Sequence, residues 1–325
     1  MRPFNFEKAN SVAEASAMKS VNKQFIAGGT NLVDLMKKNI AQPETLIDVH
    51  LALTNSIDYQ NNVLIIGAVA SNTKVAVDKE VIEKFPLISK AILAGASPQI
   101  RNMASSAGNL LQRTRCPYFY DITTPCNKRI PNSGCSAVDG NNRMSAIAGY
   151  NEQCVAVHPS DFCVALAALD ATVTAVTKEQ KEITIPFKDF HKLPENTPWL
   201  DNNLPQDAVI TKIEIPNNSF SKHSTYVKLR DRSSYAFALI SVAAALDLNG
   251  KRIKEARLAS GGVAHKPWRW FEVEKFLEGK RVAEDVFEEA AKLATKDLKP
   301  LSENGYKIPM LQGAIVTALK NCINQ

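Results

Sequence analysis

The stretch that decides the fold is Phe25-Ile26-Ala27-Gly28-Gly29-Thr30-Asn31-Leu32. Apolar residues suited to a buried strand lead directly into two glycines, and the residues from Leu32 to about Lys38 have the pattern of a helix. Glycine in such a turn lets backbone N–H groups approach a phosphate, and a helix N-terminus adds partial positive charge. The stretch has neither the Gly-Lys-Ser or Gly-Lys-Thr of a Walker loop nor the third glycine of the dinucleotide fingerprint. It therefore indicates either a phosphate-binding turn or an ordinary strand-to-helix turn.

Helical and strand patterns alternate around this turn and continue to Pro216. We expect helices at residues 11–18, 74–83, 86–94 and 161–168, and strands at 25–27, 45–49, 63–68, 172–176 and 209–215. The polar run Pro216-Asn217-Asn218-Ser219 is the best candidate linker, because proline cannot extend a central strand. The first domain is thus predicted to span residues 1–216.

Beyond this linker the pattern changes to consecutive strands followed by helices. We expect strands at 225–230, 237–247 and 253–260, with Asn249-Gly250 as a tight hairpin, and helices at 272–277, 284–296 and 310–321. The second domain, residues 220–325, is predicted to be an antiparallel sheet covered by helices, so the fold class is α+β. Three cations, Lys228, Arg230 and Arg232, are expected on one face of its first strand.

Composition excludes several classes of protein. With 325 residues, of which 45% are hydrophobic, the chain is long enough for two cores and too apolar to be disordered. Lysine and arginine (39) exceed aspartate and glutamate (33) without forming any long basic tract, which argues against nucleic acid as a partner. No segment approaches the roughly 18 uncharged apolar residues of a membrane helix, and the first thirty residues lack a signal-peptide pattern. We expect neither membrane insertion nor an export signal.

The six cysteines fall into two groups. Cys163 and Cys322 lie in apolar helical patterns and are expected to be buried without chemistry. Cys116, Cys126, Cys135 and Cys154 lie in a polar stretch of about residues 112–157, separated by nine, eight and eighteen residues. Disulfides are disfavoured in a reducing compartment, and four thiolates on loops suit either tetrahedral zinc or an iron–sulfur cubane. The gaps are longer than those of paired zinc knuckles, but spacing leaves zinc, a cluster and unligated thiols open.

Several motifs, taken together in order along nearly the whole chain, resemble the flavin subunit of the xanthine dehydrogenase and molybdenum hydroxylase family. They are Ala27-Gly28-Gly29-Thr30-Asn31, Gln99-Ile100-Arg101-Asn102 with Ala107-Gly108-Asn109, Pro159-Ser160-Asp161, and Ala259-Ser260-Gly261-Gly262-Val263-Ala264. The resemblance implies a two-part FAD-binding domain of the vanillyl-alcohol-oxidase type, followed by a small α+β domain. Ala107 departs from the glycine usual in the family, which weakens the case for a backbone contact there.

The resemblance also implies which residues bind FAD. Residues 25–31 would wrap the pyrophosphate, the second small-residue turn would lie along the ribityl chain and phosphate, Asp161 would take a hydroxyl, and Lys228 would lie near the flavin. The full implied set is Phe25, Ile26, Ala27, Gly28, Gly29, Thr30, Asn31, Leu32, Ser105, Gly108, Asn109, Asp161 and Lys228.

The cysteine stretch is similar to an insertion found in only part of this family. Arg113-Thr114-Arg115-Cys116-Pro117-Tyr118-Phe119 and Cys126-Asn127-Lys128-Arg129 are closest to the periplasmic aldehyde oxidoreductase form, which carries a [4Fe–4S] cluster here. The resemblance implies Cys116, Cys126, Cys135 and Cys154 as its ligands. Arg115, Lys128 and Arg129 would either raise the potential of this negative cluster or remain solvated loop charges.

What the resemblance implies for function is an electron-transfer subunit of a molybdenum-containing aldehyde oxidoreductase. Electrons would come from a large molybdenum-cofactor subunit through the [2Fe–2S] clusters of a small subunit to FAD, and then to an external acceptor. No catalytic residue is expected in this chain, which has no His-Glu-x-x-His or Gly-x-Ser-x-Gly motif and suggests no Cys–His pair. The alternatives are a zinc-stabilised binding or scaffold protein and a stand-alone flavin oxidase. We expect assembly in the cytoplasm, with periplasmic location open through co-export with a signal-bearing partner.

Overall fold

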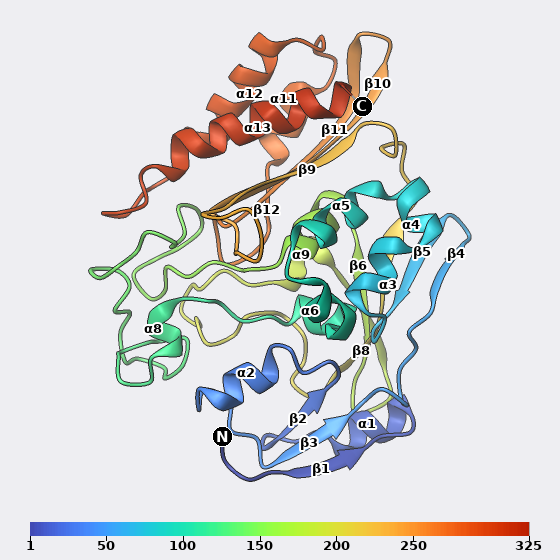
Figure 1. Cartoon of the computed structure of the whole chain (residues 1–325), viewed down its shortest axis with the longest axis vertical. Coiled ribbons are helices and arrows are strands. Elements are labelled where there is room, and N and C mark those ends of the chain that lie inside the picture. Colours follow the sequence, from blue (N-terminus) through green and yellow to red (C-terminus); the bar gives the residue numbers. More distant parts are fainter. Residues whose placement is uncertain (325) are drawn as a thin grey trace.

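The computed structural model describes residues 1–324 and arranges them as three sheets stacked along the long axis (Figure 1). The first sheet is parallel and contains β1 (Asn5–Lys8), β3 (Thr45–Asp48) and β2 (Lys23–Ile26), in that order. Helices α1 (Val12–Met18) and α2 (Leu32–Lys37) connect its strands. The predicted strand, glycine turn and helix are therefore β2, residues 27–31 and α2, and β1 is an additional edge strand that the sequence pattern did not reveal.

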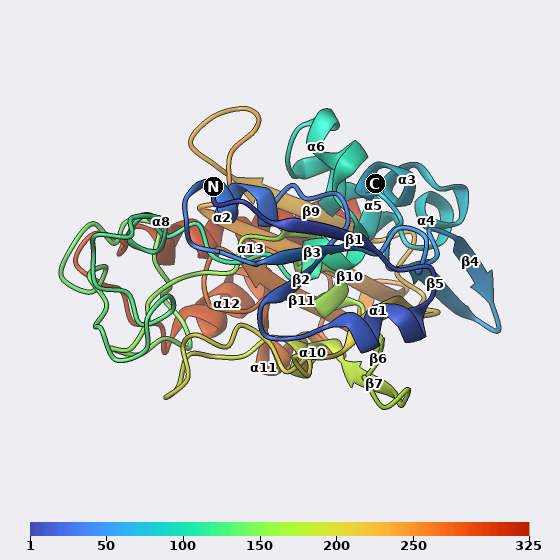
Figure 2. The same cartoon turned by 90° about the horizontal axis from the view of Figure 1, so that it is seen from below.

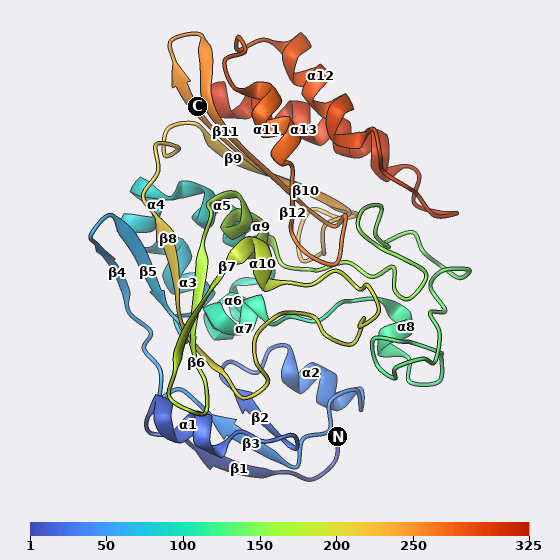
Figure 3. The same cartoon turned by 180° about the vertical axis from the view of Figure 1, so that it is seen from behind.

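The second sheet is antiparallel and lies in the middle of the molecule (Figure 3). Its strands, in order, are β4 (Ile57–Gln60), β5 (Val63–Gly67), β8 (Val209–Pro216), β6 (Thr172–Val176) and β7 (Glu182–Pro186). The helices of this region are α3 (Asn72–Val77), α4 (Lys79–Lys84), α5 (Pro86–Ala94), α6 (Pro98–Met103), α7 (Ser106–Leu110), α9 (Asp161–Ala168) and α10 (Phe187–Phe190). Apolar residues of the sheet and of α3, α5 and α9 share one core.

The helix predicted at residues 74–83 is divided in two. Asp78 has an extended backbone conformation, and its side chain accepts hydrogen bonds from the N–H groups of Glu80 and Val81. It ends α3 and caps α4, as aspartate at an N-cap commonly does. The apolar periodicity continues through the break, so the periodicity alone did not reveal it.

The third sheet is antiparallel, and the C-terminal helices cover one of its faces (Figure 1). Its strands are β12 (Trp268–Arg269), β11 (Arg252–Gly261), β10 (Ile240–Asn249) and β9 (Ser224–Leu229), and the helices are α11 (Phe271–Leu277), α12 (Glu284–Thr295) and α13 (Lys307–Ile323). Gly250 has a φ of 60° at the predicted hairpin. The predicted α+β class, with a C-terminal antiparallel sheet under helices, is confirmed.

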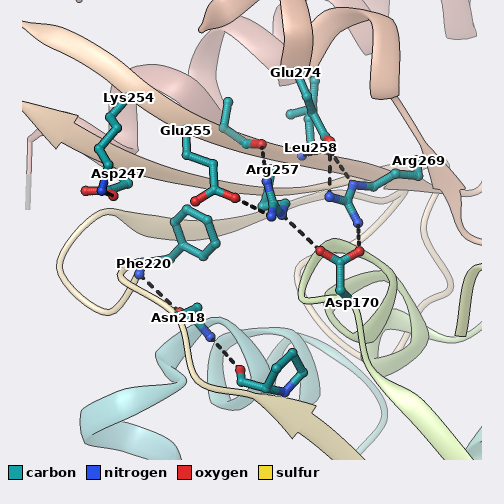
Figure 4. Close-up of polar contacts among 12 residues, drawn as sticks. Asp170, Asn218, Phe220, Asp247, Lys254, Glu255, Arg257, Leu258, Arg269 and Glu274 are labelled. Carbon is teal, nitrogen blue, oxygen red and sulfur yellow. Dashed lines mark hydrogen bonds and ion pairs between the residues drawn. The ribbon is translucent and has the colours of Figure 1, made fainter. Parts of the chain in front are cut away.

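An ion-pair network joins the third sheet to α9 (Figure 4). Asp170, just after α9, accepts hydrogen bonds from Arg257 (3.2 Å) and Arg269 (2.9 Å). Arg269 also donates to the Ala167 carbonyl and pairs with Glu274, which is itself buried. Two carboxylates, the buried Glu274 and the half-exposed Asp170, thus balance the charge of Arg269. The network holds α9, whose first residue is Asp161, against the sheet that carries Lys228.

Most of residues 111–160 lies outside regular secondary structure, at one end of the molecule (Figure 2). Its helix α8 (Pro117–Tyr120) is one turn long, and pairing within it is limited to isolated bridges such as that between Cys126 and Cys135. No helix in residues 1–324 combines the length and apolarity needed to cross a membrane.

Candidate functional site

A cavity of about 1380 Å³ opens where the first two sheets, α7, α9 and β9 approach one another. Its wall includes all thirteen residues predicted for FAD: Phe25, Ile26, Ala27, Gly28, Gly29, Thr30, Asn31, Leu32, Ser105, Gly108, Asn109, Asp161 and Lys228. They come from the glycine turn, the start of α7, the start of α9 and the edge strand β9. The fold therefore brings together residues that are up to two hundred positions apart in the sequence.

The glycine turn needs both of its glycines. A Cβ atom on Gly28 would lie 1.7 Å from the carbonyl oxygen of Met103, so the turn packs directly on the backbone at the end of α6. Gly29 has a φ of 69°, which side chains strongly disfavour. Within residues 1–324, the N–H groups of Gly28, Gly29 and Thr30 donate to no protein acceptor. These unpaired donors line the cavity and fit an anionic group such as a phosphate.

Asn31 adds a buried donor beside these backbone amides. Its side-chain oxygen accepts a hydrogen bond from the N–H of Arg113 at 3.3 Å, whereas its side-chain nitrogen is buried without a protein partner. Since a buried unpaired donor is costly, the chemistry of this turn suits a ligand that supplies acceptors.

The second small-residue turn differs from the first. Ser105 caps α7 by accepting a hydrogen bond from the N–H of Gly108, and the N–H of Ala107 donates to the Ala68 carbonyl at 2.9 Å. The departure from glycine at residue 107 is therefore harmless, because that amide is already paired within the protein. Asn109 contacts Ser160 and Gln112 through its side-chain oxygen.

Asp161 and Lys228 form a buried ion pair at the cavity wall. Their oxygen and nitrogen atoms lie 2.7 Å apart, and their side chains are 9% and 5% exposed. The second oxygen of Asp161 accepts a hydrogen bond from the Tyr226 hydroxyl at 2.8 Å. Burial, together with the Asp161 charge, raises the pKa of Tyr226 well above its usual value, so the phenol remains a donor. Asp161 thus already has two partners within the protein, and the sequence did not single out Tyr226.

The prediction of three cations on one face of a strand was wrong. Strand β9 ends at Leu229, so only Lys228 belongs to it. Arg230 donates to the Ala94 carbonyl, and Arg232 turns back onto the carbonyl groups of Ser234 and Tyr235. Lys228 also donates to the Ala94 carbonyl, so two of the three predicted cations share one acceptor and only Arg232 lies apart.

The four predicted cysteines line a second, much smaller cavity, which Lys128, Tyr118 and Phe119 also line. Two side chains organise the loops that carry them. Asn127 accepts from the Gly134 N–H at 2.8 Å and donates to the Gln153 carbonyl at 3.0 Å. It thereby links residues adjacent to Cys126, Cys135 and Cys154. Arg129 donates to the carbonyls of Tyr118 and Phe119 in α8, for which Cys116 is the N-cap residue.

The protonation of these cysteines reflects burial and their mutual contacts. Burial raises the pKa of Cys116 to about 11. A hydrogen bond between the thiols of Cys135 and Cys154 lowers the pKa of Cys135 and raises that of Cys154. All four are free of disulfides. Buried thiols of this kind become stable thiolates when a metal supplies compensating positive charge.

The separation of the sulfur atoms bears on the type of metal. A single tetrahedral zinc ion with Zn–S bonds of ≈ 2.3 Å would hold its sulfurs about 3.8 Å apart. Among the residues described, no three of these four sulfurs lie within 4.8 Å of one another. A cubane distributes its four thiolates over four different irons, so its ligands are further apart than those of one zinc ion. Cys135 and Cys154 nevertheless lie close enough for a hydrogen bond between their thiols, so the donor set suits either a zinc ion or a cluster.

The cations near the cysteines are held within the protein. Lys128 has a side chain only 4% exposed and pairs with Asp201 at 2.6 Å, so its interpretation as a solvated loop charge was wrong. Arg115 donates to the Arg113 carbonyl and stacks over Phe237. Asp201, which also binds Arg113, was not anticipated, because it lies 73 residues from Lys128 in the sequence.

A cysteine and two histidines meet in the core, which the sequence did not suggest. One ligand atom each of His158, Cys163 and His191 lies within 4.8 Å of the others. Burial lowers the pKa of both histidines and raises that of Cys163 to about 12. Since His191 is already bonded to the Leu110 carbonyl and no carboxylate belongs to the group, we regard it as part of the core. Cys322 is also fully buried, as expected.

A cavity of this size lined by unpaired glycine-turn amides suits a large ligand that carries phosphate groups. The chain belongs to the FAD-binding subunits of the molybdopterin dehydrogenase family. Residues 2–218 match the FAD binding domain in molybdopterin dehydrogenase, and residues 224–320 match the CO dehydrogenase flavoprotein C-terminal domain.

Two relatives are similar over nearly their whole length. The aldehyde oxidoreductase FAD-binding subunit PaoB of Escherichia coli is 43% identical, with 98% of each chain covered. The glyceraldehyde dehydrogenase medium chain of Sulfolobus acidocaldarius is 27% identical over 93% of this chain and 90% of its own. Among solved structures, quinoline 2-oxidoreductase from Pseudomonas putida matches with a TM-score of 0.77 at 20% identity, covering 99% of this chain and 98% of that chain. At 20% identity, the match to quinoline 2-oxidoreductase shows that the two chains share a fold.

Proposed function

We propose that this chain is the electron-transfer subunit of a molybdenum-containing aldehyde oxidoreductase and carries FAD and one [4Fe–4S] cluster. The observation that carries the proposal is the presence of two donor sets in one chain. Unpaired amides of the glycine turn face the larger cavity, and four free cysteines face the smaller one. The 43% identity to a chain named as an aldehyde oxidoreductase FAD-binding subunit supports the choice of substrate class.

FAD would be held in the larger cavity by the thirteen lining residues. FAD exchanges one or two electrons, and this chemistry belongs to the cofactor rather than to the protein. The amides of Gly28, Gly29 and Thr30 would bind its phosphates, with Asn31 as an additional donor. Lys228, fixed by Asp161, which Tyr226 holds in turn, would place its cation at the cavity wall. A fixed cation favours whichever flavin form carries more negative charge.

The [4Fe–4S] cluster would be bound by Cys116, Cys126, Cys135 and Cys154. The buried Lys128 supports this choice, since four thiolates leave a cluster net negative. A cluster at this position could either pass electrons onward or set the reduction potential of the neighbouring flavin.

The proposal extends to partners and to domain limits. Electrons would come from a large molybdenum-cofactor subunit through a small [2Fe–2S] subunit, and an external acceptor would take them from the FAD. The FAD-binding domain would span residues 1–216, with the cluster segment at about 112–157, and the second domain residues 220–325. Assembly would take place in the cytoplasm, with co-export by a signal-bearing partner as the route to the periplasm.

Two other functions remain as rivals. A zinc-stabilised scaffold protein would hold one zinc ion at its four cysteines and carry neither iron nor flavin. A stand-alone flavin oxidase would turn over aldehydes without any partner. Assays of the isolated chain with aldehydes and a dye acceptor separate this rival, because the proposal expects no turnover.

The experiment that tests the proposal compares metal and flavin content in the anaerobically purified complex. Cys126→Ser is expected to lower the iron content by about four per FAD, the number in one cubane, while FAD is retained. Cys322→Ser is the matched control, because this buried cysteine lines neither cavity, and iron should be unchanged. Equal iron in both variants, or zinc in place of iron, would overturn the cluster, and a complex without flavin would overturn the whole proposal.

A further inference from the structure

One carboxylate, Asp201, lines the larger cavity and binds two cations, one from the lining of each of the two cavities. Its two oxygens bind different cations, Lys128 at 2.6 Å and Arg113 at 2.7 Å. Arg113 also donates to the Lys128 carbonyl at 3.1 Å, so the three residues form a closed group. Asp201 belongs to the loop between α10 and β8, whereas its partners belong to the cysteine segment. The carboxylate therefore attaches that segment to the body of the FAD-binding region.

Each partner of Asp201 reaches a different cavity. Lys128 lines the small cavity with the four cysteines, and its charge acts to lower the pKa of Cys154. Arg113 lines the large cavity, donates its backbone N–H to the side chain of Asn31, and stacks over Phe119. The group thus contacts the glycine turn on one side and the cysteine site on the other.

Burial makes this group electrostatically effective. The Lys128 side chain is 4% exposed, and those of Asp201 and Arg113 are 22% and 26% exposed. Burial raises the pKa of Asp201, but Lys128 and Arg113 outweigh this effect and lower it to about 2. Asp201 is therefore ionised at neutral pH and offsets part of the positive charge that Lys128 presents to the cysteines.

We propose that Asp201 offsets the charge of Lys128 beside the cysteine site and fixes Arg113 against the glycine turn, and so acts on the cluster potential and on the flavin site together. The cluster half of this inference rests on the proposed function. Lys128 stabilises the reduced, more negative cluster most strongly when no anion offsets the charge of the lysine. The charge of Asp201 thus lowers the reduction potential of the cluster. Its ion pair with Arg113 keeps Asn31 in place.

The test is an EPR-monitored redox titration of the complete complex. Asp201→Asn removes one negative charge, so the cluster is expected to be easier to reduce. At the midpoint potential of the wild-type cluster, the ratio of reduced to oxidised cluster should rise on the order of tenfold in the variant. Lys128→Met removes one positive charge and should shift the potential in the opposite direction. A role limited to packing would not produce shifts of opposite sign.

Asp170→Asn is the matched control. Asp170 also bridges two cations, Arg257 and Arg269, but it lines neither cavity. Its variant should leave the cluster potential unchanged. If the Asp201 variant does not accumulate, Lys128→Met alone decides the question, since an unchanged potential in that variant contradicts the inference.

The rate of FAD dissociation gives a second readout that does not require a cluster. Asp201→Asn should release FAD several-fold faster than wild type, because Arg113 is no longer fixed beside Asn31, and Asp170→Asn should not. An iron-loaded Asp201 variant with normal potential and normal FAD release overturns this inference and leaves the proposed function intact. If the wild-type complex contains no cluster, the [4Fe–4S] part of the proposed function is overturned. The rate of FAD release then tests whether Asp201 fixes Arg113 beside Asn31.

Discussion

The two cavities of this chain are built in different ways. The larger cavity lies where the regular elements β2, α2, α7, α9 and β9 meet, and the turn between β2 and α2 presents unpaired backbone N–H groups to it. Loops form the smaller cavity, and side chains such as Asn127 and Arg129 fix their positions. If FAD and a cluster bind as proposed, the fold prepares the flavin site before the ligand binds, whereas the cysteine site depends on a few side chains and on bonds to the metal.

The largest expected effect would break the preformed site. Gly28→Ala places a methyl group 1.7 Å from the Met103 carbonyl oxygen, so the turn must move away from α6. We expect loss of FAD and destabilisation of about 3 kcal/mol or more, in the range of severe overpacking. Flavin absorbance and chemical denaturation measure both effects.

Gly313→Ala is the control for this change. Gly313 lies within α13, and a Cβ there would meet nothing within 4 Å. Because alanine favours helix more than glycine does, stability should stay the same or rise by up to about 1 kcal/mol. Equal effects of the two substitutions would contradict a preformed glycine turn.

The second effect would loosen only the cysteine site. Asn127→Ala removes the bonds to Gly134 and Gln153, and the side chain is almost fully buried. We expect a cost of about 2–3 kcal/mol, lower iron occupancy, and faster hydrogen exchange in residues 112–157, with FAD retained. The exposed Asn141, in the same segment, is the control and should tolerate substitution by alanine. If Asn127→Ala loses FAD together with iron, the two sites are not built separately.

The third effect concerns pH and the group that joins the sites. The pKa of Asp201 is lowered from 3.8 to about 2, so its contribution to stability is complete above pH 3.8 and is lost as pH falls through about 2. The contribution is about 2 kcal/mol, from 1.36 kcal/mol per pKa unit. Denaturation between pH 2 and 6 should show a shallower acid dependence for Asp201→Asn than for wild type. Parallel curves would mean that the carboxylate is not strongly paired in solution.

The smallest effect would sharpen the description of the flavin site. Tyr226→Phe removes one hydrogen bond to Asp161, while Lys228 remains its partner. We expect FAD affinity to fall only a few-fold, consistent with about 1 kcal/mol per hydrogen bond, and the flavin absorption bands to shift slightly. Lys228→Met should shift these bands further, because a buried charge is lost. Equal shifts in the Tyr226→Phe and Lys228→Met variants would contradict this ranking.

Local signals account for the elements that the sequence predicted correctly. Pro86 at the start of α5 and the alternation of residues 172–176 in β6 reproduce the observed bounds. The glycine turn and the hairpin at Gly250 also follow from residue type. Strands β1, β4 and β7 were missed because they are short and take their stability from distant partners.

The site was predictable to the extent that motifs carry it. The thirteen cavity residues and four cysteines lie in recognisable stretches, and the structure groups them accordingly. Tyr226, Asn127 and Asp201 act through contacts that no local pattern encodes. The bond between Arg113 and Asp201, for example, joins residues 88 positions apart.

Anomalous diffraction at the iron edge, from crystals of the complex, tests the two-cofactor account most directly. The account predicts an iron peak surrounded by Cys116, Cys126, Cys135 and Cys154, and flavin density along the glycine turn at residues 25–32. A peak at the zinc edge in place of iron, or thiols without any anomalous signal beside a flavin-filled cavity, would contradict it.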